Sequence, residues 1–331
     1  MATYKEIFGT NIEVLASDPA NPVEGQVWYN STDNVVKGAA LTTAGAWATG
    51  GNVNTGRLNL AGAGTQTAAL AFGGPPGPAD ALTESYNGSA WTEVNDLTTA
   101  RNNLGGAGIQ TSALAFAGES TSPGAKVANT ESWNGTSWTE VNDLSTINDG
   151  IAGCGADNTS ALAFGGENPS TADLSLTESW NGTSWTTVNS LNTGRTSLGG
   201  TGIQTSALAV GGLIESTPVL TAQTESWNGT SWTETGDLNT ARNHIIGRGA
   251  DNTSALAFGG ATPSATGATE EWNGTSWTET TDLSIARYLH SGSGVAGSAL
   301  AFTGSSATAT TAATEEWTGA GAPLVYTFTD S

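Results

Sequence analysis

Short apolar runs recur along the chain at nearly constant intervals, and turn-forming residues separate each run from the next. The clearest run is Ala-Leu-Ala-Phe, which occurs at 161–164 and is apolar at every position. A continuous apolar run of this length is typical of a strand that is buried on both faces. After each run comes a segment such as Thr-Glu-Ser-Trp-Asn-Gly-Thr-Ser-Trp-Thr at 130–139, which predicts two further strands around a turn.

Six copies of this arrangement fill the chain from Arg57 almost to its end. Each copy opens with a Gly-x-Gly segment, such as Gly106 and Gly108, which predicts a first strand. Repeats of about 44 to 47 residues made of short strands are typical of propellers or solenoids. Four antiparallel strands per repeat correspond to one propeller blade. Glycine suits an innermost strand, because strands crowd around a central axis there.

The Asn-Gly dipeptide after Trp133 is a strong hairpin signal. A two-residue loop at this point would place Trp133 opposite Thr136 and Glu131 opposite Trp138. Because side chains alternate along a strand, Glu131, Trp133 and Trp138 are expected on one face of the sheet.

The region before the first repeat contains one strand without a blade of its own, Ala46–Thr49. Trp47 precedes Arg57 by the same ten residues that separate Trp91 from Arg101 in the first repeat. The last repeat has Trp317 but no second tryptophan after it. We therefore expect the N-terminal strand to complete the sixth blade, which also removes exposed sheet edges.

Two alternatives to this closure stay open. The tail Leu324–Phe328 alternates like a strand and competes for the same place, and Val27–Asn30 could form part of a seventh blade. The predicted fold is all-β: a six-bladed β-propeller with four-stranded antiparallel blades, closed by the N-terminal strand, with seven blades as the alternative. Residues 1–45 are predicted as an N-terminal attachment segment and residues 46–331 as the propeller.

Composition narrows the classes of partner. Nine basic residues face thirty acidic ones, for a formal net charge of −21. Such a charge repels phosphate backbones and anionic lipids, so we expect no nucleic-acid binding. No stretch approaches the roughly 18 apolar residues of a membrane span, and the start of the chain lacks an apolar signal segment, so we expect neither membrane insertion nor a signal peptide. The single cysteine, Cys154, excludes an internal disulfide.

The sequence also lacks the motifs of common enzymes. It has no Gly-x-Ser-x-Gly elbow and no phosphate-binding loop, and two histidines with one cysteine undersupply a transition-metal centre. We therefore expect no enzymatic activity, no metal and no cofactor. A polysaccharide-degrading activity that uses two carboxylates stays open as an alternative, because thirty acidic residues allow many spatial pairs. Weak calcium binding at the Asp157 and Asp251 turns also stays open.

The sequence of the repeats resembles those of two groups of proteins. A Gly-Gly doublet after the second strand, followed by two aromatic residues, is similar to the kelch-type repeat, as at Gly165, Gly166, Trp180 and Trp185. Two repeats depart from the doublet, one of them at Ala117. The resemblance covers most of the chain and implies a propeller fold, while it says little about activity.

The Trp-Asn-Gly-Thr-Ser-Trp-Thr-Glu wording also resembles propeller proteins of tailed phages, especially marine ones, and Pro22–Lys37 is similar to a segment of tail-fibre and other virion structural proteins. This resemblance implies a non-enzymatic protein of the virion, in a tail fibre or surface appendage, made in the host cytoplasm. Its expected partners are other virion proteins, further copies of itself, and a host-surface glycan or protein. A purely architectural role, as a virion decoration or connector, is the alternative.

Positions kept in every repeat are expected to be scaffold. Arginine and glutamate recur at fixed positions and are predicted to pair within or between blades, and the tryptophans are predicted to pack rather than to stack on sugars. Binding is expected where the repeats differ, because rigid scaffolds often present divergent loops for recognition. Neutral drift in solvated loops is the alternative. The candidate binding residues are, in the variable loops, Glu119, Lys126, Glu167, Asp173 and Glu215, and, on or beside the inner strands, His244, Arg248, Tyr288 and His290.

Overall fold

The computed structural model describes residues 12–19, 22–41, 44–75, 81–120, 124–170, 172–306, 308–321 and 323–328. These residues form 33 β-strands and no α-helix. The chain divides into two compact units. The repeat unit spans Trp47–Trp317, and the terminal unit combines Met1–Ala46 with Thr318–Ser331. In the described part of the chain, no helix has the length and apolarity needed to cross a membrane.

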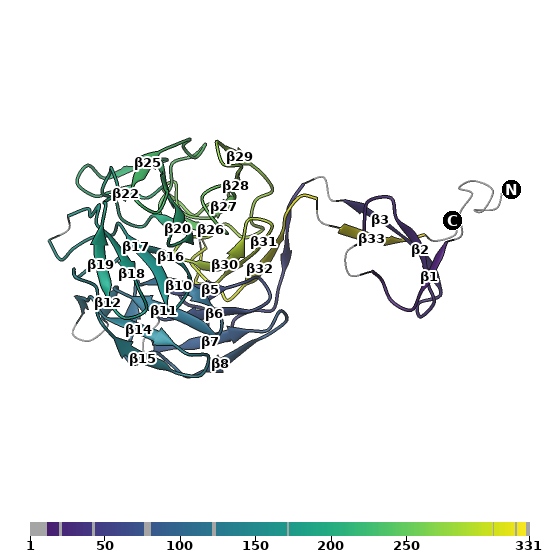
Figure 1. Ribbon diagram of the computed structural model, residues 1–331, viewed down its shortest axis with the longest axis horizontal. Coiled ribbons are helices and arrows are strands. Elements are labelled where there is room, and N and C mark those ends of the chain that lie inside the picture. The colour runs from purple at the N-terminus through teal and green to yellow at the C-terminus, as the bar shows by residue number, and fades with distance from the viewer. Residues whose placement is uncertain are drawn as a thin grey trace. The chain divides into compact units, whose positions relative to one another are not determined.

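Six four-stranded antiparallel sheets, one for each sequence repeat, make up most of the repeat unit (Figure 1). Sheets 1 to 3 contain β5 (Ala61–Gly64), β6 (Ala69–Phe72), β7 (Thr83–Tyr86) and β8 (Trp91–Val94); β10 (Gly105–Ile109), β11 (Ser112–Phe116), β14 (Thr130–Trp133) and β15 (Trp138–Val141); and β16 (Ala152–Asp157), β17 (Ser160–Phe164), β18 (Thr177–Trp180) and β19 (Trp185–Val188). Sheets 4 to 6 contain β20 (Gly199–Ile203), β21 (Ser206–Val210), β24 (Thr224–Trp227) and β25 (Trp232–Glu234); β26 (Ile246–Gly249), β27 (Ala255–Phe258), β28 (Thr269–Trp272) and β29 (Trp277–Glu279); and β30 (Ser291–Val295), β31 (Ser298–Phe302), β32 (Thr314–Thr318) and β4 (Ala46–Thr49).

The first strands of the six sheets lie next to one another in a ring. Each first strand contacts that of the following sheet, and β30 of sheet 6 contacts β5 of sheet 1. Figure 1 shows these strands gathered at the middle of the repeat unit, with the fourth strands β8, β15, β19, β25 and β29 at its periphery. Neighbouring first strands approach so closely that only glycine fits at some positions. A Cβ added to Gly62 would lie 2.7 Å from the carbonyl oxygen of Gly292.

A chain of backbone hydrogen bonds runs around one end of this ring. In sheets 1 to 5, the residue two positions before the first strand donates its N–H to the carbonyl of the equivalent residue in the preceding sheet of the ring; for example, Asn103 donates to Asn59 at 2.8 Å. Asn59 in turn donates to Leu289 of the last repeat at 2.9 Å, which links the two ends of the repeat unit. These residues have positive φ, 52° at Asn59 and 53° at Leu289, so the backbone turns there to reach its neighbour.

The strand Ala46–Thr49 takes the place that the sequence predicted for it. As β4, it is hydrogen-bonded to β32 and completes sheet 6. The ring of Trp47 lies 5.3 Å from that of Trp317 and 5.0 Å from that of Phe258, measured between centroids. An N-terminal strand and a C-terminal strand therefore share one sheet, and the last repeat has the same four strands as the others.

The hairpins between third and fourth strands differ from the predicted register. Trp133 lies opposite Trp138, and Glu131 lies opposite Glu140, so the loop contains four residues rather than two. The amide oxygen of Asn134 accepts hydrogen bonds from the N–H groups of Thr136 and Ser137, both at 2.9 Å, and this side-chain turn sets the loop length. The shift by two residues keeps Trp133 and Trp138 on one face.

The core lies between neighbouring sheets. The phenylalanine of each Ala-Leu-Ala-Phe run packs on a tryptophan of the following sheet, as Phe72 does on Trp138 with centroids 4.9 Å apart. Sheet 4 has Val210 at this position, and Val210 packs in the cluster of Trp277. Trp133 is only 2% exposed, so this tryptophan packs between sheets and offers no face to a sugar.

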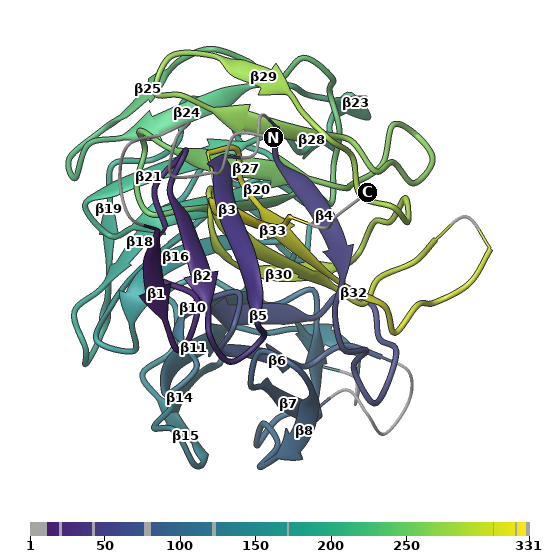
Figure 2. The same ribbon diagram turned by 90° about the vertical axis from the view of Figure 1, so that its right-hand side faces the viewer.

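The terminal unit has its own four-stranded sheet, in the order β1 (Glu13–Leu15), β2 (Val27–Asn30), β3 (Val35–Leu41) and β33 (Pro323–Thr327), seen face-on in Figure 2. Strands β1 and β2 are parallel, and the other pairs are antiparallel. Val27–Asn30 thus belongs to this sheet and does not follow the repeat pattern. The C-terminal tail also pairs here, with β3, although the sequence placed residues 318–331 in the propeller part.

Candidate functional site

The repeated arginine and glutamate positions form buried ion pairs in five of the six sheets. The nitrogen–oxygen distances lie between 2.5 and 3.1 Å in the pairs Arg57–Glu84, Arg101–Glu131, Arg195–Glu225, Arg242–Glu270 and Arg287–Glu315. Each arginine is 0% exposed. The predicted pairing is confirmed, and these cations are enclosed in the framework rather than arranged as an anion-binding ring.

Sheet 3 departs from this arrangement because Asn148 stands at the arginine position. Its side-chain N–H donates to the carbonyl of Gly165 at 2.8 Å, and its oxygen accepts from the backbone N–H of Glu167 at 2.8 Å. The next residue, Asp149, pairs with Glu167 in an isolated β-bridge. In sheet 3, amide hydrogen bonds therefore replace the buried ion pair of the other sheets.

The five predicted loop residues lie along one connected set of contacts beside this departure. The ammonium of Lys126 bonds to Glu167 and lies 2.9 Å from the carboxylate of Asp149. Glu119 of β12 (Glu119–Ser120) lies opposite Lys126 of β13 (Ala125–Lys126), and β9 (Arg101–Asn102) is the third strand of that small sheet. We call this set, with the two residues described next, the loop network: Glu119, Lys126, Asp149, Glu167, Asp173 and Glu215.

Asp173 connects the loop of sheet 3 with that of sheet 4. It forms a β-bridge with Glu167. Its carboxylate accepts hydrogen bonds from the backbone N–H groups of Glu215 at 2.9 Å and Ser216 at 3.1 Å. Glu215 follows the hairpin strand β22 (Leu213–Ile214), which pairs with β23 (Val219–Leu220). The network thus joins the loops of sheets 2, 3 and 4.

The electrostatics of the loop network reflect partial burial. Burial raises the pKa of Asp149, and the hydrogen bond from Lys126 opposes that rise. Burial disfavours the charged form of Lys126, but its bonds to Asp149 and Glu167 outweigh this effect and raise its pKa. Asp149 was not among the predicted site residues. The replacement of arginine by Asn148, its neighbour in the chain, was the signal that could have identified it.

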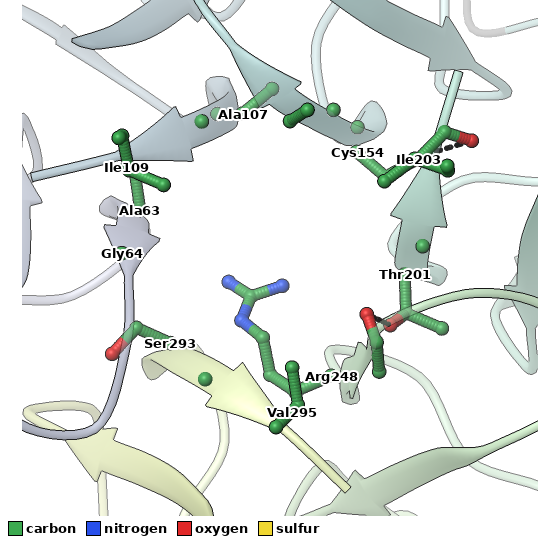
Figure 3. Close-up of a pocket in the computed structure, with 18 of the residues that line it drawn as sticks. Ala63, Gly64, Ala107, Ile109, Cys154, Thr201, Ile203, Arg248, Ser293 and Val295 are labelled. Atoms are coloured by element: carbon green, nitrogen blue, oxygen red, sulfur yellow. Dashed lines mark hydrogen bonds between the residues drawn. The ribbon is translucent and has the colours of Figure 1, made fainter.

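The inner-strand candidates lie around the central channel. Arg248 of β26 extends its guanidinium into the channel (Figure 3), where the Nε donates to the Gly292 carbonyl at 2.8 Å and an Nη donates to the Gly247 carbonyl at 2.8 Å. This end of the channel is a cavity of about 210 Å³, lined by all six first strands without any Asp or Glu. Burial lowers the pKa of Arg248 to about 10. Arg248 thus connects the neighbouring sheets 5 and 6 at the wall of the channel.

The two histidines and Tyr288 lie toward the other end of the channel. His244 and His290 line a cavity of about 100 Å³, and the ring of His244 lies 6.1 Å from that of Tyr288. Burial lowers the pKa of His244 to about 4 and that of His290 well below its usual value. Neither ring nitrogen of His290 makes a hydrogen bond of normal geometry with the described residues. Five of the nine predicted residues therefore lie in the loop network. His244, Arg248 and His290 line the channel cavities, and Tyr288 lies beside His244.

Metal-binding side chains do not gather in the part of the chain that the structure describes. No group of three or more His, Cys, Asp or Glu residues there could hold a metal ion. The Asp157 carboxylate accepts hydrogen bonds from the N–H of Thr159 at 2.8 Å and from its hydroxyl at 2.6 Å. Asp251 does the same with Thr253. These carboxylates serve the turns between first and second strands.

Comparison with known proteins bears on the fold alone. No protein-family model matches the chain, and no curated protein matches it. Among solved structures, the chain is similar to one described as "Structure of YjhT", with a TM-score of 0.66 and 13% sequence identity over 84% of this chain and 99% of that chain. A fold hosts many functions, so this likeness transfers no activity. The likeness and the ring of sheets are together compatible with a propeller-like all-β fold.

Proposed function

We propose that this protein is a non-enzymatic structural protein of a tailed-phage virion, located in a tail fibre or surface appendage, and that it binds a host-surface glycan or protein through the loop network. In this proposal the six sheets are the blades of a six-bladed, kelch-like propeller. The observation that carries the binding role is the loop network, in which charged residues of three neighbouring sheets are bonded together. The phage resemblance of Pro22–Lys37 supports the location.

The distribution of charge supports this surface as the binding site. The arginines and glutamates kept in the repeats are buried, whereas the charged side chains of the divergent loops remain partly accessible: Lys126 is 18% exposed and Glu167 is 15% exposed. Bonds between neighbouring loops hold these side chains in place before a partner arrives. Such preorganisation reduces the entropy lost on binding. Carboxylates and exposed backbone groups suit a partner rich in hydroxyl or amine donors, as surface glycans and proteins are.

Binding of the purified protein to a glycan array and to host cells tests the proposal. Glu215→Arg reverses an exposed charge, and Asp173→Asn weakens the bonds that hold the loop of sheet 4. We expect each change to reduce adsorption by about tenfold or more, which is a loss of about 1.4 kcal/mol. Asp251→Asn, in a turn at the other end of the strands, is the matched control and should leave adsorption unchanged. Equal adsorption by all three variants and the parent would contradict the proposed surface.

The architectural role has its own supporting observation. The terminal unit carries exposed apolar side chains, Val14, Val23, Tyr326 and Phe328, with exposed fractions between 41% and 67%. Exposed apolar groups of this kind mark contact surfaces, which other virion proteins could cover. A particle reconstruction distinguishes the two roles. The loop network buried against another virion subunit favours the connector, and an outward-facing network favours host recognition.

A further inference from the structure

The buried glutamate of each sheet normally lies beside a guanidinium. In sheet 1, one amino group of Arg57 donates to the Glu84 carboxylate at 3.1 Å and lies 3.5 Å from the Ala71 carbonyl. The other amino group donates to the Leu82 carbonyl at 2.6 Å and to the Gly73 carbonyl at 2.8 Å. In the other four arginine-containing sheets the guanidinium again bonds to the carboxylate. It also bonds to the carbonyl two residues before the carboxylate in sheets 2 and 6, and to a carbonyl of the second strand in sheets 4 and 5. Each of these five sheets therefore has an oxygen-lined position that holds a guanidinium.

Sheet 3 retains the oxygens but lacks the cation. The equivalent atoms are the Glu178 carboxylate, the Leu176 carbonyl and the Ala163 carbonyl, since Ala163 lies opposite Glu178 as Ala71 lies opposite Glu84. Asn148 is shorter than arginine. Both of its polar atoms are engaged away from the carboxylate, by Gly165 and Glu167.

Glu178 is consequently a buried carboxylate without a balancing charge. Its exposed fraction is 3%. Its oxygens accept hydrogen bonds from the backbone N–H of Ser145, at 3.2 and 3.0 Å. No described cationic side chain forms an ion pair with it, and Lys126 is engaged by Asp149 and Glu167. Burying an unpaired carboxylate costs several kcal/mol of folding free energy. A cation that binds from solution offsets this cost.

We propose that sheet 3 binds a monovalent alkali cation, Na⁺ or K⁺, at the position that a guanidinium occupies in the other five sheets. The Glu178 carboxylate and the Leu176 and Ala163 carbonyls are its protein ligands. Ligand sets made only of oxygen select hard cations over transition metals. One carboxylate balances one positive charge, as one guanidinium does in the other sheets. The five arginine-containing sheets serve as an internal control within the same chain.

Thermal unfolding in KCl, NaCl and choline chloride at equal ionic strength tests the site, because choline is too large to enter it. We expect the midpoint to be about 2–4 °C higher in KCl or NaCl than in choline chloride, since a ligand that binds only the folded state stabilises it. Asn148→Arg supplies the missing guanidinium and should abolish this difference. Asn189→Arg adds the same charge at an exposed position of sheet 3 and should preserve it.

Two further measurements keep the proposal testable if Asn148→Arg does not fold. Glu178→Gln keeps the size of the side chain but removes its charge, and it should also abolish the difference between the salts. Crystals soaked in rubidium chloride should show an anomalous peak between the Glu178 carboxylate and the Leu176 carbonyl, with none beside Glu131. Equal midpoints of the parent protein in all three salts, or no rubidium peak at Glu178, would overturn the proposal.

Discussion

The indole N–H of Trp91 donates a hydrogen bond of 3.1 Å to the hydroxyl of Thr314, which lies 223 residues away in the sequence. Trp91 belongs to the first sheet of the ring and Thr314 to the last. The same contact joins every other pair of neighbouring sheets, through Trp138–Thr83, Trp185–Thr130, Trp232–Thr177, Trp277–Thr224 and Trp47–Thr269. The junction between the ends of the repeat array is thus built like the junctions within it.

This equivalence predicts that Thr314→Val destabilises the repeat unit as much as Thr224→Val does. Each change leaves a buried indole N–H without an acceptor, which costs about 1–3 kcal/mol. Denaturant unfolding followed by tryptophan fluorescence measures both. Thr186→Val, at an exposed position, is the control and should have little effect. A Thr314→Val protein as stable as the control would show that the first and last sheets are not held together by this contact.

The buried ion pairs predict a large effect of removing one partner. Glu131→Gln leaves the Arg101 guanidinium buried without a counter-charge, and breaking such a pair costs about 3–5 kcal/mol. Glu140 lies opposite Glu131 in the same hairpin but is exposed. Glu140→Gln should therefore change the free energy of unfolding by less than about 0.5 kcal/mol. Similar unfolding midpoints for the two variants would contradict the assigned role of the pair.

The thiol of Cys154 should be unreactive in the folded protein. Burial raises the pKa of Cys154 to about 12, although the charge of Arg248 opposes that rise. The thiolate is the reactive form, so an aromatic disulfide reagent at pH 8 should label Cys154 only after denaturation. Ala156 is exposed on the same strand. Ala156→Cys in a Cys154→Ala background should react at once, and equally fast labelling of Cys154 would refute its burial.

The burial of His290 predicts that the folded protein loses stability as the pH falls. Burial lowers the pKa of His290 in the folded state, whereas in the unfolded chain it stays near 6.5. The unfolded state then binds more protons below pH 6.5, so the stability contributed by neutral His290 is present above that pH and is lost as the pH falls. His290→Leu should flatten the stability profile between pH 7 and 5.

The same substitution should also stabilise the protein at pH 7, by about 1–3 kcal/mol, because it removes two buried nitrogens without partners. Leu198 occupies the equivalent position in sheet 4. Leu198→His is the reverse test and should introduce a further acid-sensitive group, beside His290 and His244. Parallel pH profiles of the parent and His290→Leu proteins would contradict the assignment to this residue.

Much of the repeat unit could be predicted because the same sequence pattern occurs in all six repeats. The bounds of Ala46–Thr49 and the pairing of Arg101 with Glu131 follow from spacing and repetition. The length of the hairpin loop after Trp133 could not be predicted from spacing and repetition. Its length is set by the Asn134 side chain rather than by the Asn-Gly backbone preference that usually decides a hairpin.

The candidate site was predictable only in part. The five loop residues were identified by their divergence, and the structure brings them into one network. The place of Arg248 depends on its bonds to the Gly292 carbonyl of the neighbouring sheet, which no local pattern encodes. The pairing of the tail with β3 is likewise a contact between distant segments. The alternating pattern of the tail predicts a strand but does not indicate which strand it pairs with.

The pairing of β4 with β32 has a consequence for biosynthesis. Residues 46–49 leave the ribosome before all six repeats, whereas residues 314–318 belong to the sixth repeat. Sheet 6 therefore cannot form until the sixth repeat has been made, and until then β4 and the growing stack each keep an unpaired edge. Nascent chains with such edges are prone to misassembly with one another. The order of synthesis thus makes the nascent chain most vulnerable to misassembly before the sixth repeat emerges from the ribosome.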